Sequence, residues 1–228
     1  MKTAGERREP IYLAGPRGFW YDANTECAMF EILERLEQMP DMRIVKVNAP
    51  AYPAAPFFGI PVFASREFSI LLAFDDDMGA VDGLHALVTG HISSLVWDSG
   101  QTRHMEALLN NRRRSDFEAH YASLKIETFP DDLANTPRSL RPFLLAREAQ
   151  CSDEMEAVMS VSMANGHMLA RCVDPDDGGD GGTLAFYAAG AVGAEIGTAR
   201  CRRIERLAAA RADVWQKNPS LPPNGSAG

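Results

Sequence analysis

The chain has 228 residues, a formal net charge of −8 and 46% hydrophobic residues. A chain of this length can bury a core without disulfides or metals, so we expect a globular protein of one large domain or two small ones. The acidic balance argues against nucleic acid as a partner, because nucleic-acid binders concentrate lysine and arginine on one face. The basic clusters at 112–114 and 200–206 lack interleaved aromatics, and we interpret them as solvated helix faces.

The four cysteines are scattered without CxxC spacing, and no neighbouring histidines complete a zinc pattern. The sequence therefore predicts reduced thiols, no metal site and no cofactor. Residues 1–15 carry charges but no apolar signal core, and no run reaches the roughly 18 apolar residues that a membrane span needs. We expect a cytoplasmic protein without a membrane partner.

The first predicted elements alternate between strand and helix. Residues 11–15 (IYLAG) predict a buried strand, which Gly15 and Pro16 end. Residues 22–39 predict a helix with one apolar face, and residues 42–47 (MRIVKV) predict the next strand. This order is β–α–β.

The run at 48–65 (NAPAYPAAPFFGIPVFAS) carries four prolines and a glycine. Proline cannot donate to a strand ladder and breaks a helix, so this composition predicts a loop and excludes a central strand or a regular helix. Such a loop covers a ligand or simply packs on the surface, and both interpretations stay open.

The alternation continues with a strand at 69–74, a helix at 79–90 and a strand at 92–97. A helical stretch at 101–121 and a short strand at 124–129 follow. Strands that alternate with helices imply a parallel sheet covered on both faces. The predicted fold class is therefore α/β, with a mainly parallel, flavodoxin-like sheet.

The second half repeats the order of the first in weaker form. Residues 151–166 stand where the first helix stood, 167–173 resemble the strand at 42–47, and 180–193 resemble 77–90. We infer either a degenerate tandem duplication, in which 140–193 runs strand, helix, strand, helix, or two unrelated halves that share a periodicity. The expected division is an α/β unit at 1–129, a boundary loop at 130–139, a second unit with a C-terminal helix at 140–216, and a flexible tail at 217–228.

Four aspartates stand where a predicted strand meets a predicted helix: Asp75, Asp76, Asp77 and, one turn into the helix, Asp82. In an open parallel sheet, ligands bind beyond the carboxyl ends of the strands. Two carboxylates there could serve as nucleophile and general acid in sugar transfer. The alternative is that one aspartate caps the helix and the others are solvated near its positive end. The local context leaves both interpretations open.

A resemblance to a known family bears on this choice. The segment IYLAGP at 11–16, followed by an aromatic residue and a helix, resembles the first strand and loop of the nucleoside 2-deoxyribosyltransferase family. The segment DMGAVDGLHALVTGHISSLV at 77–96 is similar to that family's second signature, which contains an aspartate, a glycine, the catalytic glutamate and a Gly-Tyr-Ala-like triplet. The resemblance covers about residues 11–97 and implies the family's α/β fold.

Carried over residue by residue, the resemblance implies Asp82 as the nucleophile and Asp77 as the assisting aspartate. The substrate-binding residues that it implies are Gly15, Pro16, Phe19, Asp76, Gly79 and His85. Such an enzyme cleaves or exchanges the N-glycosidic bond of a nucleoside or nucleotide. The family's nucleophile is a glutamate, and aspartate is one methylene shorter. The second hypothesis is therefore a non-enzymatic α/β protein that binds a nucleotide-like ligand or a protein partner, as an inhibitor or assembly component, and a homo-oligomer fits either hypothesis.

The run DPDDGGDGGT at 174–183 packs four aspartates and four glycines into ten residues. Clustered carboxylates suit a hard cation, but the EF-hand order is missing, so a flexible acidic turn is the favoured interpretation. Within the proposed duplication, Asp180 is the expected counterpart of Asp77. Ala185 or Phe186 takes the position of Asp82, which predicts a non-catalytic second half.

Overall fold

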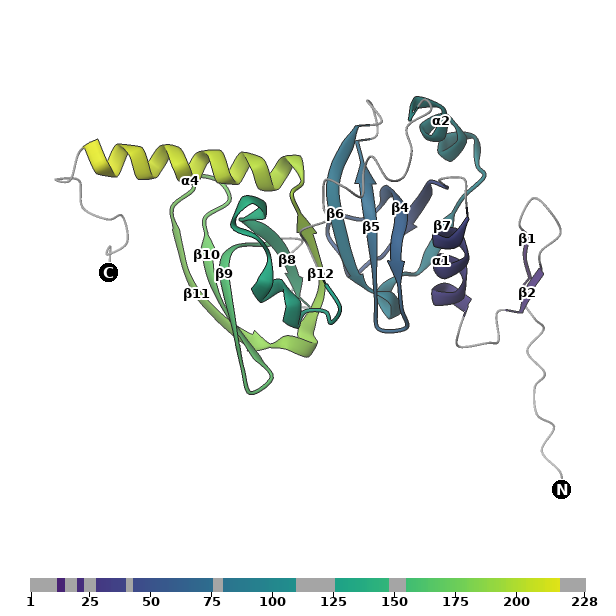
Figure 1. Cartoon of the computed structure of the whole chain (residues 1–228), viewed down its shortest axis with the longest axis horizontal. Helices are drawn as coiled ribbons and strands as arrows, with labels where there is room; N and C mark the ends of the chain where they lie inside the picture. Colours follow the sequence, from purple (N-terminus) through teal and green to yellow (C-terminus); the bar gives the residue numbers. More distant parts are fainter. Residues whose placement is uncertain are drawn as a thin grey trace, which may run out of the picture.

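A computed structural model describes residues 12–14, 20–22, 28–39, 43–75, 80–109, 126–147 and 155–217. Ten of its strands form one sheet in the order β11-β10-β9-β8-β12-β6-β5-β4-β3-β7, and every neighbouring pair is antiparallel (Figure 1). Their bounds are β3 (Val45–Asn48), β4 (Phe57–Ala64), β5 (Phe68–Phe74), β6 (Val81–Val88), β7 (Ser94–Val96), β8 (Phe143–Arg147), β9 (Glu156–Ala164), β10 (His167–Val173), β11 (Asp180–Tyr187) and β12 (Ala191–Ile196). The remaining elements are a separate hairpin of β1 (Tyr12–Ala14) and β2 (Trp20–Asp22), the helices α1 (Ala28–Gln38), α2 (Gly100–Leu108) and α4 (Ala199–Lys217), and the 3-10 turns η1 (Thr89–His91), η2 (Asp131–Asn135), η3 (Arg138–Leu140) and η4 (Ala188–Gly190).

The predicted α/β class with a mainly parallel sheet is wrong. Residues 79–90, predicted as a helix, contain strand β6, and residues 151–166, predicted as a second helix, contain strand β9. Strand β6 lies between β5 and β12 and is buried on both faces at its centre. A strand buried on both faces reads as a continuous apolar run, so its sequence lacks the alternation that separates strand from helix.

The predicted loop at 48–65 is also partly wrong, because residues 57–64 form the inner strand β4 despite Pro61. The register with β5 explains how the sheet accepts this proline. Pro61 lies opposite Leu71 and Phe63 opposite Ile70, so Val62 is an extra residue in the ladder. Proline is tolerated in a sheet at such a bulge because the ladder is already interrupted there.

Several local predictions are confirmed. Helix α1 buries Ile32, Leu33 and Leu36, and strands form within or next to the segments predicted at 42–47, 69–74, 92–97 and 167–173. The predicted strand at 11–15 appears as β1, but it pairs with β2 in the separate hairpin. Residues 126–129 form no strand, and the greater part of the helix predicted at 101–121 lies outside the described residues. The C-terminal helix begins at Ala199, because residues 191–196 form β12.

The sheet consists of two units with the same topology. In unit 1 (β3 to β7 and α2), four strands form a meander, a 3-10 turn follows, and the fifth strand pairs with the first before a helix begins. Unit 2 (β8 to β12 and α4) has the same order, with β12 paired to β8 and followed by α4. The units join where β6 pairs with β12.

The two units also match residue by residue, with a constant spacing of 99 positions. Gly83 and Gly182 both have positive φ. The residue immediately before each glycine, Asp82 in unit 1 and Gly181 in unit 2, has no partner on the neighbouring strand and forms a β-bulge. Asp98 and Gly197, again 99 apart, both have positive φ two residues before the first helical residue of their unit. A shared fold alone would not preserve these irregularities at one spacing, so we interpret the units as a tandem duplication.

This repeat does not pair the segments that the sequence suggested. The predicted order of strand, helix, strand, helix at 140–193 is wrong, because this region contains five strands and no α-helix among its described residues. Residues 180–193 correspond to 81–94 rather than to 77–90. The counterpart of Asp82 is therefore Gly181, and the counterpart of Asp180 is Val81.

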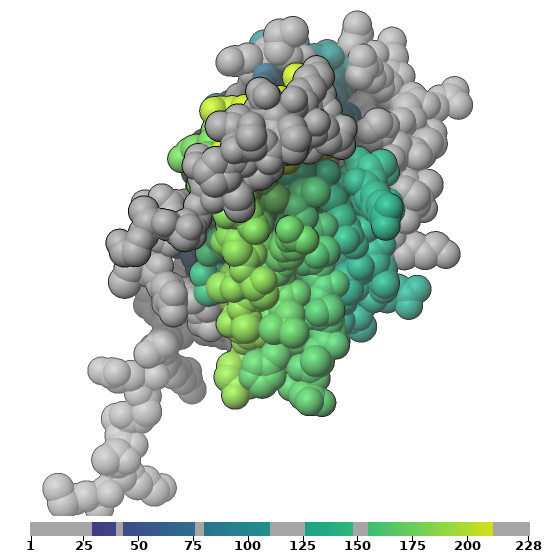
Figure 2. Space-filling model, turned by 90° about the vertical axis from the view of Figure 1, so that its left-hand side faces the viewer, coloured from purple at the N-terminus to yellow at the C-terminus, as the bar shows by residue number. Residues whose placement is uncertain are grey.

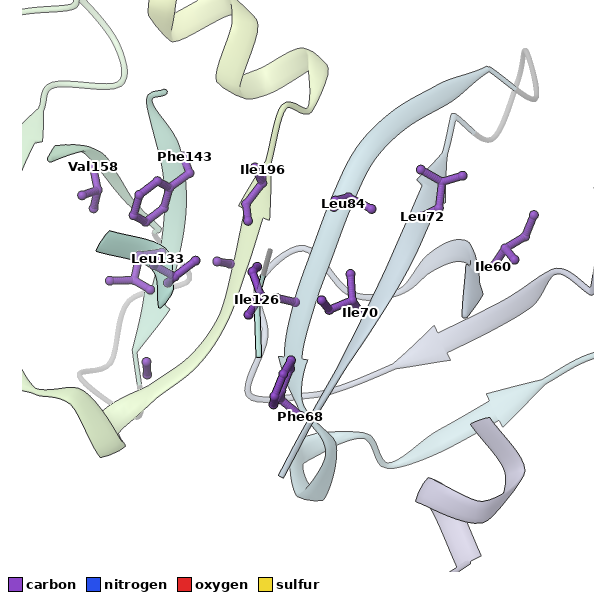
Figure 3. Packing of buried hydrophobic residues seen from close by; sticks show 14 of the residues in the cluster. Ile60, Phe68, Ile70, Leu72, Leu84, Ile126, Leu133, Phe143, Val158 and Ile196 are labelled. Carbon is purple, nitrogen blue, oxygen red and sulfur yellow. The ribbon is translucent and has the colours of Figure 1, made fainter. Parts of the chain in front are cut away.

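Unit 2 is turned over relative to unit 1. Each unit contributes five strands, and an odd number of antiparallel strands forces the next unit to run in the opposite direction. We call face A the side of the sheet that carries Ile70 and Leu72, and face B the side that carries Leu71 and Ala73. Helix α2 packs on face A through Met105, whereas its counterpart α4 packs on face B. Figure 3 shows the face A core running through both units, with Ile126 close to the junction between them.

Candidate functional site

Asp82 lies at the start of β6, in contact with the other unit. The backbone N–H of Ala199 donates to its Oδ1 at 2.7 Å, and Arg202 lies 3.6 Å from the same oxygen. Ala199 is the first residue of α4, where backbone N–H groups have no partner within the helix. Asp82 therefore caps a helix, although it is the helix of unit 2 and not one that follows Asp82 in the chain.

Of the seven remaining predicted site residues, the structure describes one and does not describe the other six. His85 is described and is buried in β6. The predicted residues outside the described part of the chain are Gly15, Pro16, Phe19, Asp76, Asp77 and Gly79. The distance between the carboxyls of Asp82 and Asp77 is thus not defined, and the catalytic pair stays a prediction.

His85 belongs to a buried polar cluster at the junction of the two units. Its Nδ1 lies 2.9 Å from the hydroxyl of Tyr52, and its ring stacks on Phe57 with centroids 4.2 Å apart. His85 and Glu195 are directly opposite each other in the β6–β12 ladder. The hydroxyl of Thr198 donates to Glu195 Oε2 at 3.0 Å, so the cluster extends to the start of α4.

Cys201 completes this cluster on the first turn of α4. Its backbone N–H donates to Thr198 Oγ1 at 3.2 Å, and its thiol lies 3.5 Å from the carbonyl oxygen of Glu195. Arg200 approaches Glu195 at 3.8 Å, at the outer side of the cluster. Cys201 is a free thiol, as is Cys172 in β10.

Burial shifts the pKa of each of these groups in the direction that favours its neutral form. Desolvation lowers the pKa of His85 to about 3 and raises the pKa of Glu195, against the opposing effects of Thr198 and Arg200. Desolvation also raises the pKa of Cys201 and the pKa of Tyr52, the latter with a further contribution from Glu195. The raised pKa of Cys201 disfavours a thiolate nucleophile.

Two glycines allow the backbones of the two units to approach closely at the junction. A Cβ on Gly83 would lie 2.7 Å from the carbonyl oxygen of Ile196, and a Cβ on Gly193 would lie 2.8 Å from the Tyr52 ring. Only glycine fits at such distances. We conclude that the cluster holds the two units together, and no group of metal-ligating side chains is found among the described residues.

In the run at 174–183, residues 174–179 form a turn that contacts α4, and residues 180–183 begin β11. Asp174 accepts hydrogen bonds from the backbone of Asp176 and Asp177, and Asp177 is paired with Arg211 of α4. Gly178 lies directly against the backbone of Leu207 and Ala208. Helix α4 therefore crosses unit 2 at the end of the sheet near this turn (Figure 1).

Beyond α4, face B of unit 2 carries exposed side chains on three adjacent strands. Ladder partners lie on the same face, and those pairs are Ser160 with Arg171, Ser162 with Leu169, Arg171 with Thr183, Leu169 with Ala185, and His167 with Tyr187. We call these eight residues the open face. Leu169 is 42% exposed and Tyr187 is 69% exposed, with the rings of Tyr187 and His167 4.2 Å apart.

The three positions of β10 on this face have apolar and buried counterparts in unit 1. Phe68 corresponds to His167, Ile70 to Leu169 and Leu72 to Arg171. The ring of Phe68 lies 6.1 Å from that of Phe129, and Ile126 packs in the same cluster. In unit 1, the chain that follows α2 thus supplies the cover that the open face lacks.

Sequence reasoning missed both the junction cluster and the open face. Tyr52 lies in a segment predicted as a loop, and Glu195 and Cys201 lie more than 100 residues from His85, so no local pattern connects them. The sequence pattern that could have revealed the open face is the alternation in HMLARCV (167–173), where Leu169 and Arg171 fall on one side. That alternation indicates a strand with one solvated face.

No described helix is long and apolar enough to cross a membrane. Comparisons with protein-family models, curated proteins and solved structures find no match, so the chain is not assigned to a family.

Proposed function

We propose that this protein is a binding protein rather than an enzyme, and that it holds a polypeptide partner against the open face. One observation carries the proposal: unit 1 and unit 2 share a fold, but no described residue covers in unit 2 the surface that Ile126 and Phe129 cover in unit 1. The partner supplies the missing cover.

The composition of the open face suits a protein partner. Leu169 provides an apolar centre, Tyr187 and Arg171 are of the types that contribute most to protein interfaces, and serine and threonine form the polar surroundings. The chemistry of the partner follows from the cover in unit 1, which is an aliphatic and an aromatic side chain on one irregular segment. We therefore expect an extended segment with an aliphatic and an aromatic residue a few positions apart.

The described carboxylate of the predicted catalytic pair supports this choice over bond cleavage. Asp82 is engaged by Ala199 and Arg202, and unit 2 has a glycine in its place. Catalysis through Asp82 is a prediction that no contact in the described residues favours.

The test uses a fluorescent peptide with the sequence of residues 122–133, which contains Ile126 and Phe129, and the intact protein. We expect saturable binding that Leu169→Glu and Tyr187→Ser weaken at least tenfold. Leu108→Glu is the matched control, because Leu108 is a similarly exposed leucine (39%) on α2, away from the open face. A peptide that fails to saturate, or that binds Leu169→Glu as well as wild type, would refute the proposal.

A further inference from the structure

Strands β11 and β7 are the two end strands of the sheet, and each has a counterpart strand in the other unit. Strand β11 is the counterpart of β6, and β7 is the counterpart of β12. Inside the chain, β6 pairs with β12 to join the units. The two end strands are thus copies of the two strands that already pair with each other.

We propose that β11 of one molecule pairs antiparallel with β7 of a second copy, head to tail, in the register of the β6–β12 junction. This interface uses the backbone edge of β11, whose residues Thr183 and Ala185 also belong to the open face, and it does not depend on the proposed function. Figure 2 looks onto this end of the molecule, where β11 and β10 face the viewer.

The register of the junction predicts the contacts between the two copies. At the junction, Leu87 lies opposite Gly193, and the 99-residue spacing converts this pair into Phe186 opposite Ser94. A large side chain again meets a small one. The other predicted pairs are Ala185 with Leu95, Leu184 with Val96, and Thr183 with Trp97.

The central pair changes in a way that favours association. At the junction it is His85 with Glu195, both polar and both buried. Between copies it becomes Leu184 with Val96, and Val96 is 40% exposed on its own. Pairing would remove apolar surface from water without burying an ionisable group.

Strand direction allows the same interface to repeat. A sheet of ten antiparallel strands has end strands that run in opposite directions, so a second copy can be added by translation without being turned over. Neither β11 (DGGTLAFY) nor β7 (SLV) contains the lysine or proline that commonly blocks pairing at an edge. Because such a contact is heterologous, it extends into a chain of molecules rather than closing at a dimer.

One feature of the junction is missing at the edges, which makes the contact weaker than the internal one. The carboxylate of Asp82 is replaced by Gly181, so no cap from β11 would reach the helix of the neighbour. Helix α2 keeps only the cap within its own chain segment, the capping box of Ser99 and Thr102, whereas α4 has Thr198 and Asp82 together. We expect association that depends on protein concentration rather than a permanent oligomer.

The test uses analytical ultracentrifugation of the full chain and two blocked variants. Leu184→Pro or Ala185→Pro blocks β11, and Leu95→Pro or Val96→Pro blocks β7. Adjacent strand residues point their N–H groups to opposite sides, so in each pair one proline removes an edge N–H and the other removes a hydrogen bond to the inner neighbouring strand. The variant that keeps the wild-type melting temperature by circular dichroism is the one to use.

Wild type should form a concentration-dependent series of oligomers, each blocked variant alone should stay monomeric, and a mixture of the two should stop at dimers. A β7-blocked variant that still dimerises alone would indicate β11–β11 pairing and overturn the proposal, as would a wild type that stays monomeric throughout. The register is tested by Ala185→Cys in one molecule and Leu95→Cys in the other, with Cys27 and Cys151 replaced by serine. This pair should cross-link on oxidation, whereas Ala185→Cys with Ser93→Cys should not.

Discussion

Strands β5 and β10 occupy the same place in the two units, yet their sequences record different surroundings. All seven residues of β5 (FSILLAF) are buried, whereas β10 (HMLARCV) alternates, with Leu169 and Arg171 exposed. Helix α1 lies on one side of unit 1, and Ile126 and Phe129 lie on the other. In unit 2, η2 with its buried Leu133 packs on face A, whereas the described residues leave Leu169 and Arg171 exposed on face B of β10.

This difference shows that the burial of a strand depends on what covers the sheet and not on its position in the topology. The exposed face of β10 carries polar residues where β5 is apolar, because a solvated face tolerates them. The comparison can be tested by making the same change at positions 99 residues apart.

The largest expected difference is between the losses of folding stability caused by Ile70→Ala and by Leu169→Ala. Ile70 is 8% exposed in the face A core, and Leu169 is 42% exposed. Truncation of a buried isoleucine leaves a cavity and should cost about 2–5 kcal/mol, whereas Leu169→Ala should cost less than about 1 kcal/mol. Urea unfolding of dilute protein measures both. Equal losses would mean that the open face is covered in solution.

A smaller difference in lost stability is expected between Gly83→Ala and Gly182→Ala. Both glycines have positive φ, so each alanine should cost about 1 kcal/mol of backbone strain. Gly83 is also pressed against the backbone of Ile196 and Thr198, whereas nothing lies within 4 Å of a Cβ on Gly182. Gly83→Ala should therefore cost about 1–3 kcal/mol more than Gly182→Ala. Equal thermal melting shifts would contradict the close junction.

The next effect concerns pH. The folded protein keeps His85 neutral down to a pKa of about 3, whereas the unfolded chain protonates near 6.5, so stability should fall as the pH drops below 6.5. At about pH 5 this single group should account for about 2 kcal/mol. The double variant His85→Leu with Tyr52→Phe, which places the unit 2 residue at position 85, should lose this slope.

The measurement must separate His85 from Glu195, the buried carboxyl that lies opposite it in the ladder. The raised pKa of Glu195 acts in the opposite direction, since its contribution to stability is present at low pH and lost as the pH rises through that pKa. Glu195 remains in both proteins, so the difference between their pH profiles isolates His85. A double variant with the wild-type slope below pH 6.5 would contradict the assignment.

The smallest effect is expected at Asp82. Asp82→Ala removes the acceptor of the Ala199 N–H, although Thr198 still accepts from Cys201, and should cost about 1 kcal/mol of stability. Asp82→Asn should cost less because an oxygen acceptor remains. Thermal melting measures both variants, alongside release of free base from a panel of nucleosides. Base release by wild type that disappears in a stably folded Asp82→Asn would restore the catalytic interpretation.

Local sequence was sufficient where one element decides its own pattern. Helix α1 was predictable because its apolar residues recur at helical spacing, and β5 because a short apolar run there is rich in Ile, Leu and Phe. The repeat was detectable as well, through GLHA at 83–86 and GTLA at 182–185, but aligning 180–193 with 77–90 displaced it by four residues.

Tertiary structure alone decided the direction of the strands, the partner of Asp82 and the cover of each face. Residues 79–90 fit a helix or a buried strand equally well, and only pairing with β5 and β12 makes them a strand. Asp82 caps a helix 117 residues away, and His85 meets Tyr52 and Glu195 only because the units are joined edge to edge. Periodicity reports which side of an element is buried, but the identity of the group on that side depends on contacts that are distant in the chain.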